Sequence, residues 1–306
     1  MITTASKSCP ICNAENIKMI SEPVIDPKYS KYMRNKYRSC YCLECEYYFV
    51  SPCIDLSSDE WSQMYSDGYF NTTMTKWWAK KRQKERNRVL GIFKKYIGNE
   101  KIIKFLEIGC GEGYVLIDAQ KLNWDITAID VYDNRINEAK SLNIRFEYGD
   151  LITKNFGEEE FDLVYMDSVL EHVTDPVKYT EKIYKIMKYD GLAYFAVPNE
   201  NALIFKFRDL VFKLLGNKNK TTSFQPFQHP YHINGYTKKS LLKLLEDKGF
   251  RIINYRNYAG WYEFLKYRFM SKGFLKNLML LPIHLLAVIL RMEYYQDVIC
   301  VKEKRR

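Results

Sequence analysis

The chain has 306 residues, of which 47% are hydrophobic, and this supplies enough apolar surface for about two folded domains. A disordered or fibrous protein is therefore excluded. The net charge of +10 is distributed unevenly along the chain. Residues 201–306 hold 20 basic and 7 acidic residues, whereas residues 1–200 hold 27 basic and 30 acidic residues. We expect any anionic partner to meet the last third of the chain.

The N-terminal residues predict neither a signal peptide nor a membrane span. Residues 1–12 contain no apolar run, and no stretch of the chain approaches the ~20 apolar residues that cross a bilayer. We therefore expect a cytoplasmic protein. Eight cysteines in such a chain favour metal binding or catalysis over disulfides.

Five of the eight cysteines fall within the first 45 residues. Two Cys-x-x-Cys pairs are separated by 29 residues, and each pair can place two thiolates on one metal ion. We predict a closed, structural zinc site whose binding energy folds a small domain over residues 1–56. Its predicted ligands are Cys9, Cys12, Cys42 and Cys45.

Two questions about this site stay open in the sequence. Such a knuckle usually ends in a residue with positive φ, which Asn13 tolerates and Glu46 tolerates poorly. Cys40 therefore remains an alternative to Cys42 or Cys45 as a ligand. Reduced, buried cysteines that bind no metal are the competing interpretation.

Residues 57–98 are predicted to be helical, because apolar residues recur at helical spacing, as in Trp61, Met64 and Tyr65. Most of the remaining residues in this segment are charged or polar. We expect it to pack one face on a neighbouring core and to act as a linker or cap for the domain that follows.

From residue 102 onward, strands and helices alternate. The predicted helices run from just after Gly113 to about residue 122, over 133–142, from Thr174-Asp175-Pro176 onward, and over 237–248. The predicted strands are 102–108, 126–130, 144–148, 161–166, 192–197, 251–255 and 297–301. This alternation is typical of an α/β fold with a doubly wound, mostly parallel, Rossmann-like sheet of seven strands. We assign it to residues 99–306, with residues 216–236 as a lid loop.

Ligands of such a sheet bind beyond the carboxyl ends of its strands, and three groups of residues lie there. The first strand runs into Glu107-Ile108-Gly109-Cys110-Gly111-Glu112-Gly113, whose glycines allow a ligand to approach the backbone. Asp130 ends the second strand, where a carboxylate can accept both hydroxyls of a ribose. Asp150, followed by Leu151, comes after the third strand, where a carboxylate can accept from an adenine amino group. Tyr114 stands where a dinucleotide-binding loop would need glycine.

The Gly-x-Gly-x-Gly loop, Asp130, Asp150 and the segment Phe161-Asp162-Leu163-Val164-Tyr165-Met166-Asp167-Ser168-Val169-Leu170-Glu171-His172-Val173 together resemble the class I S-adenosylmethionine-dependent methyltransferases. The resemblance covers about residues 100–200. It implies that S-adenosylmethionine lies across the sheet, with the glycines at its methionine end, Asp130 on the ribose and Asp150 near the adenine. The cofactor-binding residues that it implies are Glu107, Gly109, Gly111, Gly113, Asp130, Asp150, Leu151, Met166 and Ser168.

A narrower resemblance extends over nearly the whole chain. The order of cysteine knuckles, the segment 61–70, the methyltransferase block and then His232-Ile233-Asn234-Gly235-Tyr236-Thr237 is similar to bacterial methyltransferases of surface-glycan and natural-product pathways. That resemblance implies a small hydroxylated acceptor, namely a sugar, nucleotide-sugar or glycan of surface-polysaccharide biosynthesis, with or without a phosphate.

A neutral hydroxyl acceptor needs a general base, and the chain has four histidines. His172 closely follows the fourth strand, so we expect it at the methyl-transfer centre. His232, in the covering loop with His229, is the second candidate. The competing interpretations are that His172 braces Glu171 and the loop backbone, and that His232 anchors the lid.

Two other functions compete with methylation of a small molecule. A zinc knuckle with a basic surface is also typical of some RNA-modifying enzymes, but Met166-Asp167-Ser168-Val169 does not match the proline-rich clamp used on base amines. We therefore do not expect nucleic acid as a partner. A scaffold that binds S-adenosylmethionine without catalysis is the third interpretation.

Residues 278–290 form an apolar run that is too short to span a bilayer and is flanked by Lys272, Lys276 and Arg291. Such a run is typical of a core or dimer helix. The alternative is an interfacial segment, residues 272–291, that rests on an anionic membrane and would place the protein at its inner face.

Overall fold

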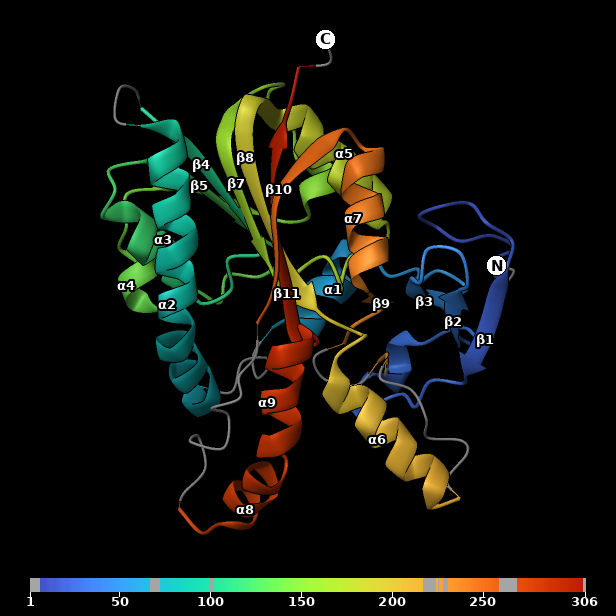
Figure 1. Ribbon diagram of the computed structural model, residues 1–306. Helices are drawn as coiled ribbons and strands as arrows, with labels where there is room; N and C mark the ends of the chain where they lie inside the picture. Colours follow the sequence, from blue (N-terminus) through green and yellow to red (C-terminus); the bar gives the residue numbers. More distant parts are fainter. Residues whose placement is uncertain are drawn as a thin grey trace.

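The computed structural model describes residues 6–66, 72–98, 102–216, 224, 226–227, 231–258 and 269–304, except for the side chains at positions 28–29 and 72–81. A seven-stranded sheet in the order β10-β11-β8-β7-β4-β5-β6 forms its centre (Figure 1). β10 (Phe250–Tyr258) and β11 (Tyr295–Lys302) are antiparallel. The parallel strands are β4 (Lys104–Ile108), β5 (Asp125–Asp130), β6 (Arg145–Tyr148), β7 (Phe161–Asp167) and β8 (Met187–Pro198). The predicted α/β fold with a mostly parallel, seven-stranded sheet is confirmed.

Helices cover both faces of this sheet (Figure 1). Phe93 belongs to the same apolar core as Phe105 of β4 on one face, and Leu244 to the same core as Val164 of β7 on the other. The sheet is therefore buried on both faces, as a doubly wound fold requires. The helices of the first face are α2 (Thr72–Ile97), α3 (Tyr114–Gln120) and α4 (Asn137–Lys140), and those of the second face are α5 (Pro176–Ile186) and α7 (Lys238–Asp247).

Two predicted helices differ from those observed. The helix predicted over 133–142 is only the four residues of α4, because the Asp133 carboxylate accepts hydrogen bonds from the backbone N–H and the guanidinium of Arg135 at 3.2 and 2.9 Å. A side chain that captures a nearby N–H competes with the helix. The segment predicted as helical over 57–98 contains two helices, α1 (Ser58–Met64) and α2.

A smaller antiparallel sheet holds the cysteine pairs. Its fourth strand comes from the chain just before α7, far from the other three in sequence. Tyr47 shares one apolar core with Tyr236 and Leu241, so the N-terminal segment buries apolar side chains against the α7 layer. The strands, in order, are β1 (Ile17–Ser21), β2 (Arg38–Cys42), β3 (Tyr48–Ser51) and β9 (Asn234–Gly235).

Three helices project from the edge at which the parallel strands end: α6 (Leu203–Leu214), α8 (Lys272–Met279) and α9 (Leu281–Leu290) (Figure 1). α6 follows β8, and α9 leads into the antiparallel β11, so both are attached at this edge. The Leu203 N–H donates to the Met292 carbonyl at 2.9 Å. In the described ranges no single helix has the length and composition to cross a bilayer, but α8 and α9 taken together, with a 42° bend, meet that test.

Candidate functional site

The glycine-rich loop after β4 adopts a backbone conformation that favours glycine. Gly109, Gly111 and Gly113 have φ values of +71°, +50° and +79°. A Cβ atom on Gly109 would lie 2.2 Å from Cγ2 of Val169, and one on Gly113 would lie 2.5 Å from Cβ of Ala139. The loop therefore packs directly on its neighbours and leaves no room for side chains at these positions.

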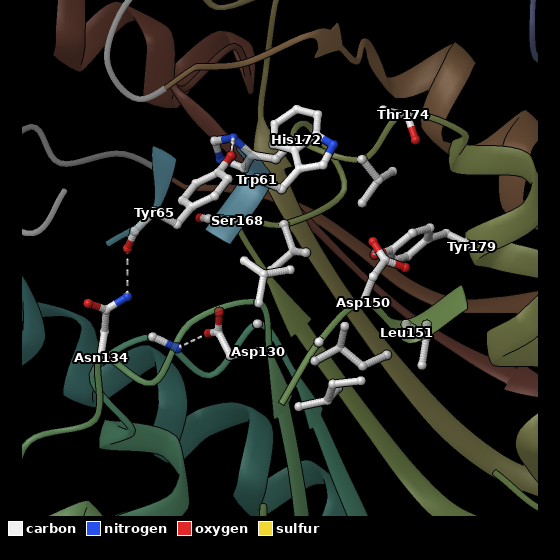
Figure 2. Close-up of a pocket in the computed structure, with 18 residues that line it drawn as sticks. Trp61, Tyr65, Asp130, Asn134, Asp150, Leu151, Ser168, His172, Thr174 and Tyr179 are labelled. Carbon is white, nitrogen blue, oxygen red and sulfur yellow. Dashed lines mark hydrogen bonds between the residues drawn. The ribbon is translucent and has the colours of Figure 1, made fainter. Parts of the chain in front are cut away.

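Asp130, at the end of β5, is bound to the same loop. Its Oδ2 accepts from the Gly111 N–H at 2.8 Å, and its Oδ1 accepts from the Tyr132 N–H at 3.3 Å. Burial raises the pKa of Asp130 to about 6, although these backbone hydrogen bonds favour the charged form. A carboxylate is thus fixed between the loop and the cavity described next (Figure 2).

A cavity of about 140 Å³ lies at the carboxyl ends of β4, β5 and β7 (Figure 2). A second cavity of about 290 Å³ adjoins it and shares Trp61, Asp150 and Tyr179 with the first. Together they make a cleft of the size that binds small molecules. The predicted site residues that line the first cavity are Gly109, Gly111, Asp130, Asp150, Leu151, Ser168 and His172.

The other predicted site residues lie near this cavity but do not line it. Met166 is buried in the sheet core, and Gly113 precedes α3 as its N-cap. Glu107 is also buried; burial raises its pKa well above the ordinary range, and its Oε2 has no hydrogen-bond partner in the described part of the chain. His232 lies next to His172, outside the lining.

Several lining residues were not predicted as site residues. Trp61 and Tyr65 of the α1 segment face the cavity together with Asn134, whose side-chain amide donates to the Tyr65 carbonyl at 3.0 Å (Figure 2). Tyr179 donates to Oδ2 of Asp150 at 2.5 Å. The available signal was the spacing of Trp61 and Tyr65, because residues four apart share one face of a helix.

His172 and His232 form one cluster with Glu171 and Tyr65. The hydroxyl of Tyr65 is 3.0 Å from Nδ1 of His172, and the two imidazole rings meet edge to face with centroids 4.9 Å apart. Nε2 of His232 lies 3.9 Å from Oε1 of Glu171. Glu171 is 1% exposed, and burial raises its pKa to about 8. His172 is the histidine of this cluster that lines the cavity.

Asn234 of β9 holds the backbone segment that carries this cluster. Its side-chain amide donates to the carbonyls of Leu170 and Val173 at 3.3 and 2.6 Å, and its Oδ1 accepts from the Tyr47 hydroxyl. Its backbone N–H donates to the Glu171 carbonyl at 3.0 Å. The turn after β7 therefore depends on a residue that also belongs to the small sheet.

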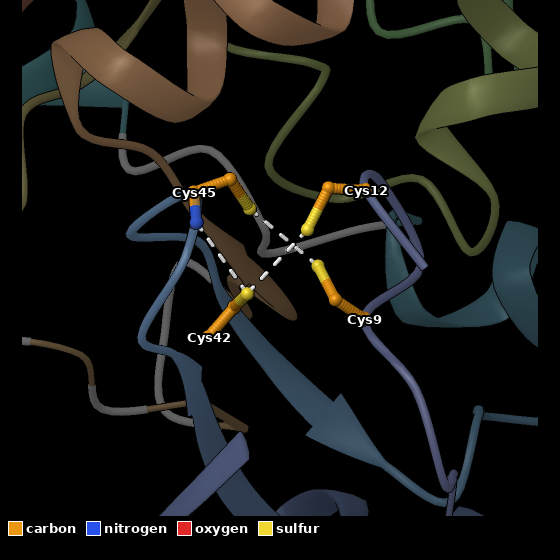
Figure 3. Close-up of side chains that lie close together, drawn as sticks. All are labelled: Cys9, Cys12, Cys42 and Cys45. Atoms are coloured by element: carbon orange, nitrogen blue, oxygen red, sulfur yellow. Dashed lines mark hydrogen bonds between the residues drawn. The ribbon is translucent and has the colours of Figure 1, made fainter. Parts of the chain in front are cut away.

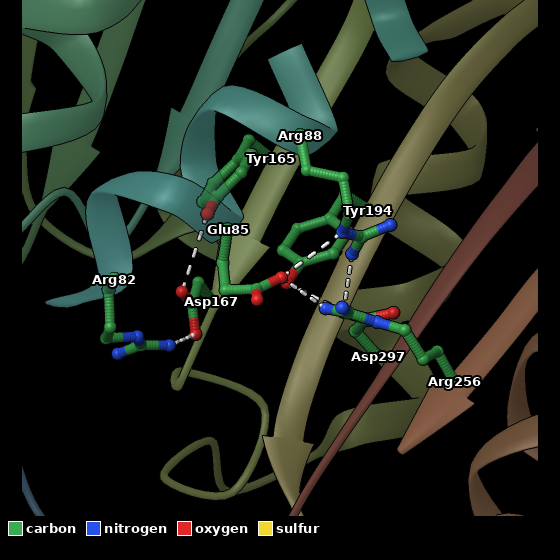
Figure 4. Close-up of polar contacts among 8 residues, drawn as sticks. All are labelled: Arg82, Glu85, Arg88, Tyr165, Asp167, Tyr194, Arg256 and Asp297. Carbon is green, nitrogen blue, oxygen red and sulfur yellow. Dashed lines mark hydrogen bonds and ion pairs between the residues drawn. The ribbon is translucent and has the colours of Figure 1, made fainter. Parts of the chain in front are cut away.

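A polar network connects α2 to the opposite side of the same turn (Figure 4). Asp167 pairs with Arg82 and accepts from the Ser168 hydroxyl at 2.9 Å. Asp297 of β11 is 0% exposed and accepts from Arg88 and Arg256, each at 2.6 Å. This network fixes α2 on the sheet and orients Asp167 beside Ser168, a cavity-lining residue.

The two cysteine pairs converge on one point (Figure 3). Cys9, Cys12, Cys42 and Cys45 have sulfur atoms within 4.8 Å of one another, and the Cys9–Cys45 and Cys12–Cys42 sulfur distances are 3.5 and 3.6 Å. These distances exceed a disulfide bond but match the edge of a tetrahedral zinc site, ~3.8 Å for a Zn–S bond of 2.3 Å.

The backbone around these pairs has the shape of two knuckles. Asn13 and Glu46 both have positive φ, +58° and +62°, and each donates its N–H to the carbonyl of the first cysteine of its pair. Glu46 thus adopts a conformation that its residue type disfavours. Cys40 lies inside β2, opposite Phe49, and is not part of the four-sulfur cluster.

A family model described as a methyltransferase domain matches residues 77–255. The chain belongs to this methyltransferase family. It is therefore an enzyme, a methyltransferase, as the sequence predicts.

Individual relatives are distant. A ubiquinone biosynthesis O-methyltransferase of Coxiella burnetii is 26% identical over 168 residues, which are 51% of this chain and 71% of the relative. A chain from the complex of the Haloferax volcanii Trm112 methyltransferase activator with a putative methyltransferase superposes with a TM-score of 0.51 at 14% identity, over 80% of this chain and 98% of that one. The match to the Haemonchus contortus phosphoethanolamine N-methyltransferase 2 has a TM-score of 0.49 at 16% identity and covers 71% of this chain but only 53% of the nematode chain. These structural similarities concern the fold.

The buried carboxyl of Glu171 leads to a prediction about pH. Its pKa is raised from 4.5 to about 8 in the folded chain, so its contribution to stability is present below about pH 4.5 and is lost as the pH rises through about 8. We expect Glu171→Gln to match the wild type near pH 5 and to be more stable near pH 8.5, with a difference that grows by at most about 1.4 kcal/mol per pH unit. Urea unfolding at both pH values measures this.

Glu246→Gln is the matched control, because Glu246 is exposed on α7. It should leave the pH dependence of the free energy of unfolding as it is in the wild type. Equal pH dependence in the wild type and Glu171→Gln would show that Glu171 is ionised in the folded chain throughout this range.

Proposed function

We propose that the chain transfers the methyl group of S-adenosylmethionine to a hydroxyl group of a small acceptor in the cleft, with His172 as the general base. The observation that carries this proposal is the position of His172, which lines the same cavity as the glycine loop and Asp130. A base and a donor site that open into one cavity can serve one reaction.

The residues of the cleft fit the donor. Gly109 and Gly111 line the first cavity without side chains, so a ligand can approach their backbone closely. Asp130 and Asp150 provide acceptor oxygens along the cleft for the ribose and the adenine. S-adenosylmethionine supplies an activated methyl group on a positively charged sulfur. The chain has to hold the acceptor in line with that methyl group, exclude water and accept one proton.

His172 would accept the proton of the acceptor hydroxyl at Nε2, because the Tyr65 hydroxyl engages Nδ1. In the tautomer that can act as this base, Nδ1–H of His172 donates to the Tyr65 hydroxyl oxygen, and Nε2 carries the lone pair that takes the proton. This hydrogen bond orients the ring, and His232 packs against the ring edge to face. We assign His232 to positioning rather than to proton transfer, since it does not line the cavity.

The aromatic wall made by Trp61 and Tyr65 suits a flat or ring-shaped acceptor. A sugar ring, as the sequence resemblance implies, and a phenol both present such a face with a hydroxyl at its edge. The O-methyltransferase name of the 24–26% identical relatives favours oxygen as the methylated atom. Nucleotide-sugars and catechols are therefore the acceptors to offer.

Replacing Asp130 tests the donor site. We expect Asp130→Ala to weaken S-adenosylmethionine binding by about 1.5–3 kcal/mol, the value of hydrogen bonds to a charged group, because ribose would lose its acceptor. Calorimetric titration measures the affinity. Asp133→Ala is the control, since Asp133 pairs with Arg135 and does not line either cavity. Unchanged binding by Asp130→Ala would move the donor site elsewhere.

Replacing His172 tests the base. His172→Ala should lower turnover at least ~10²-fold while donor affinity stays the same, because proton transfer is needed only in the reaction step. His284→Ala, a histidine of α9 outside the cleft, should keep wild-type turnover. Normal turnover by His172→Ala with a hydroxyl acceptor, or activity with amine acceptors alone, would contradict the proposal.

We further propose that the four-cysteine cluster holds a structural zinc ion. Four protein thiolates would fill a tetrahedral site and leave no position for substrate. The ion would connect residues 9–12 to the end of β2 and so stabilise the small sheet, which contacts the Glu171 turn through β9.

Elemental analysis should therefore give about one zinc per chain. Cys12→Ser should lose this zinc and much of the folded yield, because metal binding contributes to folding. Cys40→Ser is the matched control and should keep the full zinc content, since Cys40 lies outside the cluster. Full zinc retention by Cys12→Ser would contradict the assignment.

A further inference from the structure

We propose that α6, α8 and α9 form a surface that docks on an anionic lipid membrane. This projecting surface comprises the described residues 203–216 and 269–291. It is separate from the cleft and does not depend on the proposed methyl transfer, so vesicle binding can be measured without any acceptor.

The projecting surface exposes an unusual number of large apolar side chains. Leu214 and Ile289 are each 77% exposed, and Met279 is 80% exposed. No residue of α6 or α8 is buried, and Ala287 is the buried residue of α9. Helices of a globular domain normally bury an apolar stripe, and exposed apolar patches of this kind mark interaction sites.

Charge decides which partner fits. The projecting surface carries six basic residues and one acidic residue, Asp209, which lies 3.8 Å from Arg208. Apolar side chains bordered by lysine and arginine match an interfacial segment on anionic lipid. A two-fold dimer through the same surface would place these basic residues against their own copies. The basic residues are Lys206, Arg208, Lys213, Lys272, Lys276 and Arg291.

The chain path favours a position along the membrane surface instead of across it. Tyr258, the last residue of β10, is paired with Tyr295, the first residue of β11. The connection that contains α8 and α9 therefore leaves the sheet and returns to it at one point. A single crossing of the bilayer would instead place the two ends of this connection on opposite sides of the membrane. α8 and α9 have 8 and 10 residues, and each is less than the ~30 Å hydrocarbon thickness in length at 1.5 Å per residue.

The direction of the parallel strands shows where the cleft lies relative to the projecting surface. α6 follows the carboxyl end of β8, and the cleft lies at the carboxyl ends of β4, β5 and β7. Since these strands are parallel, the cleft and the projecting surface lie at the same edge of the sheet. A docked chain would therefore hold the cleft at the edge of the sheet that faces the membrane.

Vesicle sedimentation of the full chain tests the proposal. The wild type should sediment with vesicles made of equal parts phosphatidylglycerol and phosphatidylcholine, and binding should fall at high salt. Leu214→Glu with Ile289→Glu should weaken this binding at least ~10-fold by removing apolar contacts and adding repulsion. Ile102→Glu is the matched control, since Ile102 is also 77% exposed but precedes β4 at the other edge.

Thermal unfolding should show that all variants fold like the wild type, since only exposed side chains change. Three results would overturn the proposal: no sedimentation of the wild type, equal binding to pure phosphatidylcholine vesicles, or equal loss in Ile102→Glu. A concentration-dependent dimer that dissociates in Leu214→Glu with Ile289→Glu, without vesicle binding by the wild type, would assign the surface to a second copy of the chain.

Discussion

The hydrogen bonds of Asn234 connect the separate parts of this molecule. One side chain receives the Tyr47 hydroxyl from the cysteine-bearing sheet and satisfies two carbonyls of the turn that carries Glu171 and His172. All of these groups are buried, so each would cost about 1–3 kcal/mol if left unsatisfied. The position of the histidines therefore depends on the presence of the small sheet, and a metal ion that stabilises that sheet would act on the cleft through Asn234.

Four carboxyl groups lie in or beside the cleft: Asp130 and Asp150 line it, and Asp167 and Glu171 are the chain neighbours of the lining residues Ser168 and His172. Asp130 and Asp150 each accept hydrogen bonds from backbone N–H groups, while Asp167 is compensated by Arg82. Among the described residues the Glu171 carboxyl has no hydrogen-bond partner, and burial raises its pKa to about 8, which favours the neutral form at lower pH. Asp130 and Asp150 can therefore offer negative charge to a cationic methyl donor. Glu171, in its neutral form, adds no charge beside the histidines.

The sequence predicted those features of the fold and the site that depend on residues close together in the chain. Buried apolar runs predicted the parallel strands, and glycines after the first strand predicted a loop whose backbone a ligand can approach. Asp130 and His172 were identifiable because Asp130 ends a strand and His172 closely follows one. Trp61, Tyr65 and Asn234 were not, since Tyr65 meets His172 across 107 positions and β9 has only two residues. Cys40 could be set aside as a metal ligand in favour of Cys42 only once the register of β2 with β3, which places Cys40 opposite Phe49, was known.

The pairing of Tyr258 with Tyr295 also bears on how this architecture can diverge. A connection whose two ends meet across one residue pair can be lengthened or shortened without moving a strand, and the entropic cost of closing it grows only with the logarithm of its length. The α8–α9 excursion is in this sense an insertion in a hairpin. Evolution can replace this insertion with another segment and so change the surface on which the enzyme docks. The methyl-donor site at the ends of β4, β5 and β7 would stay the same.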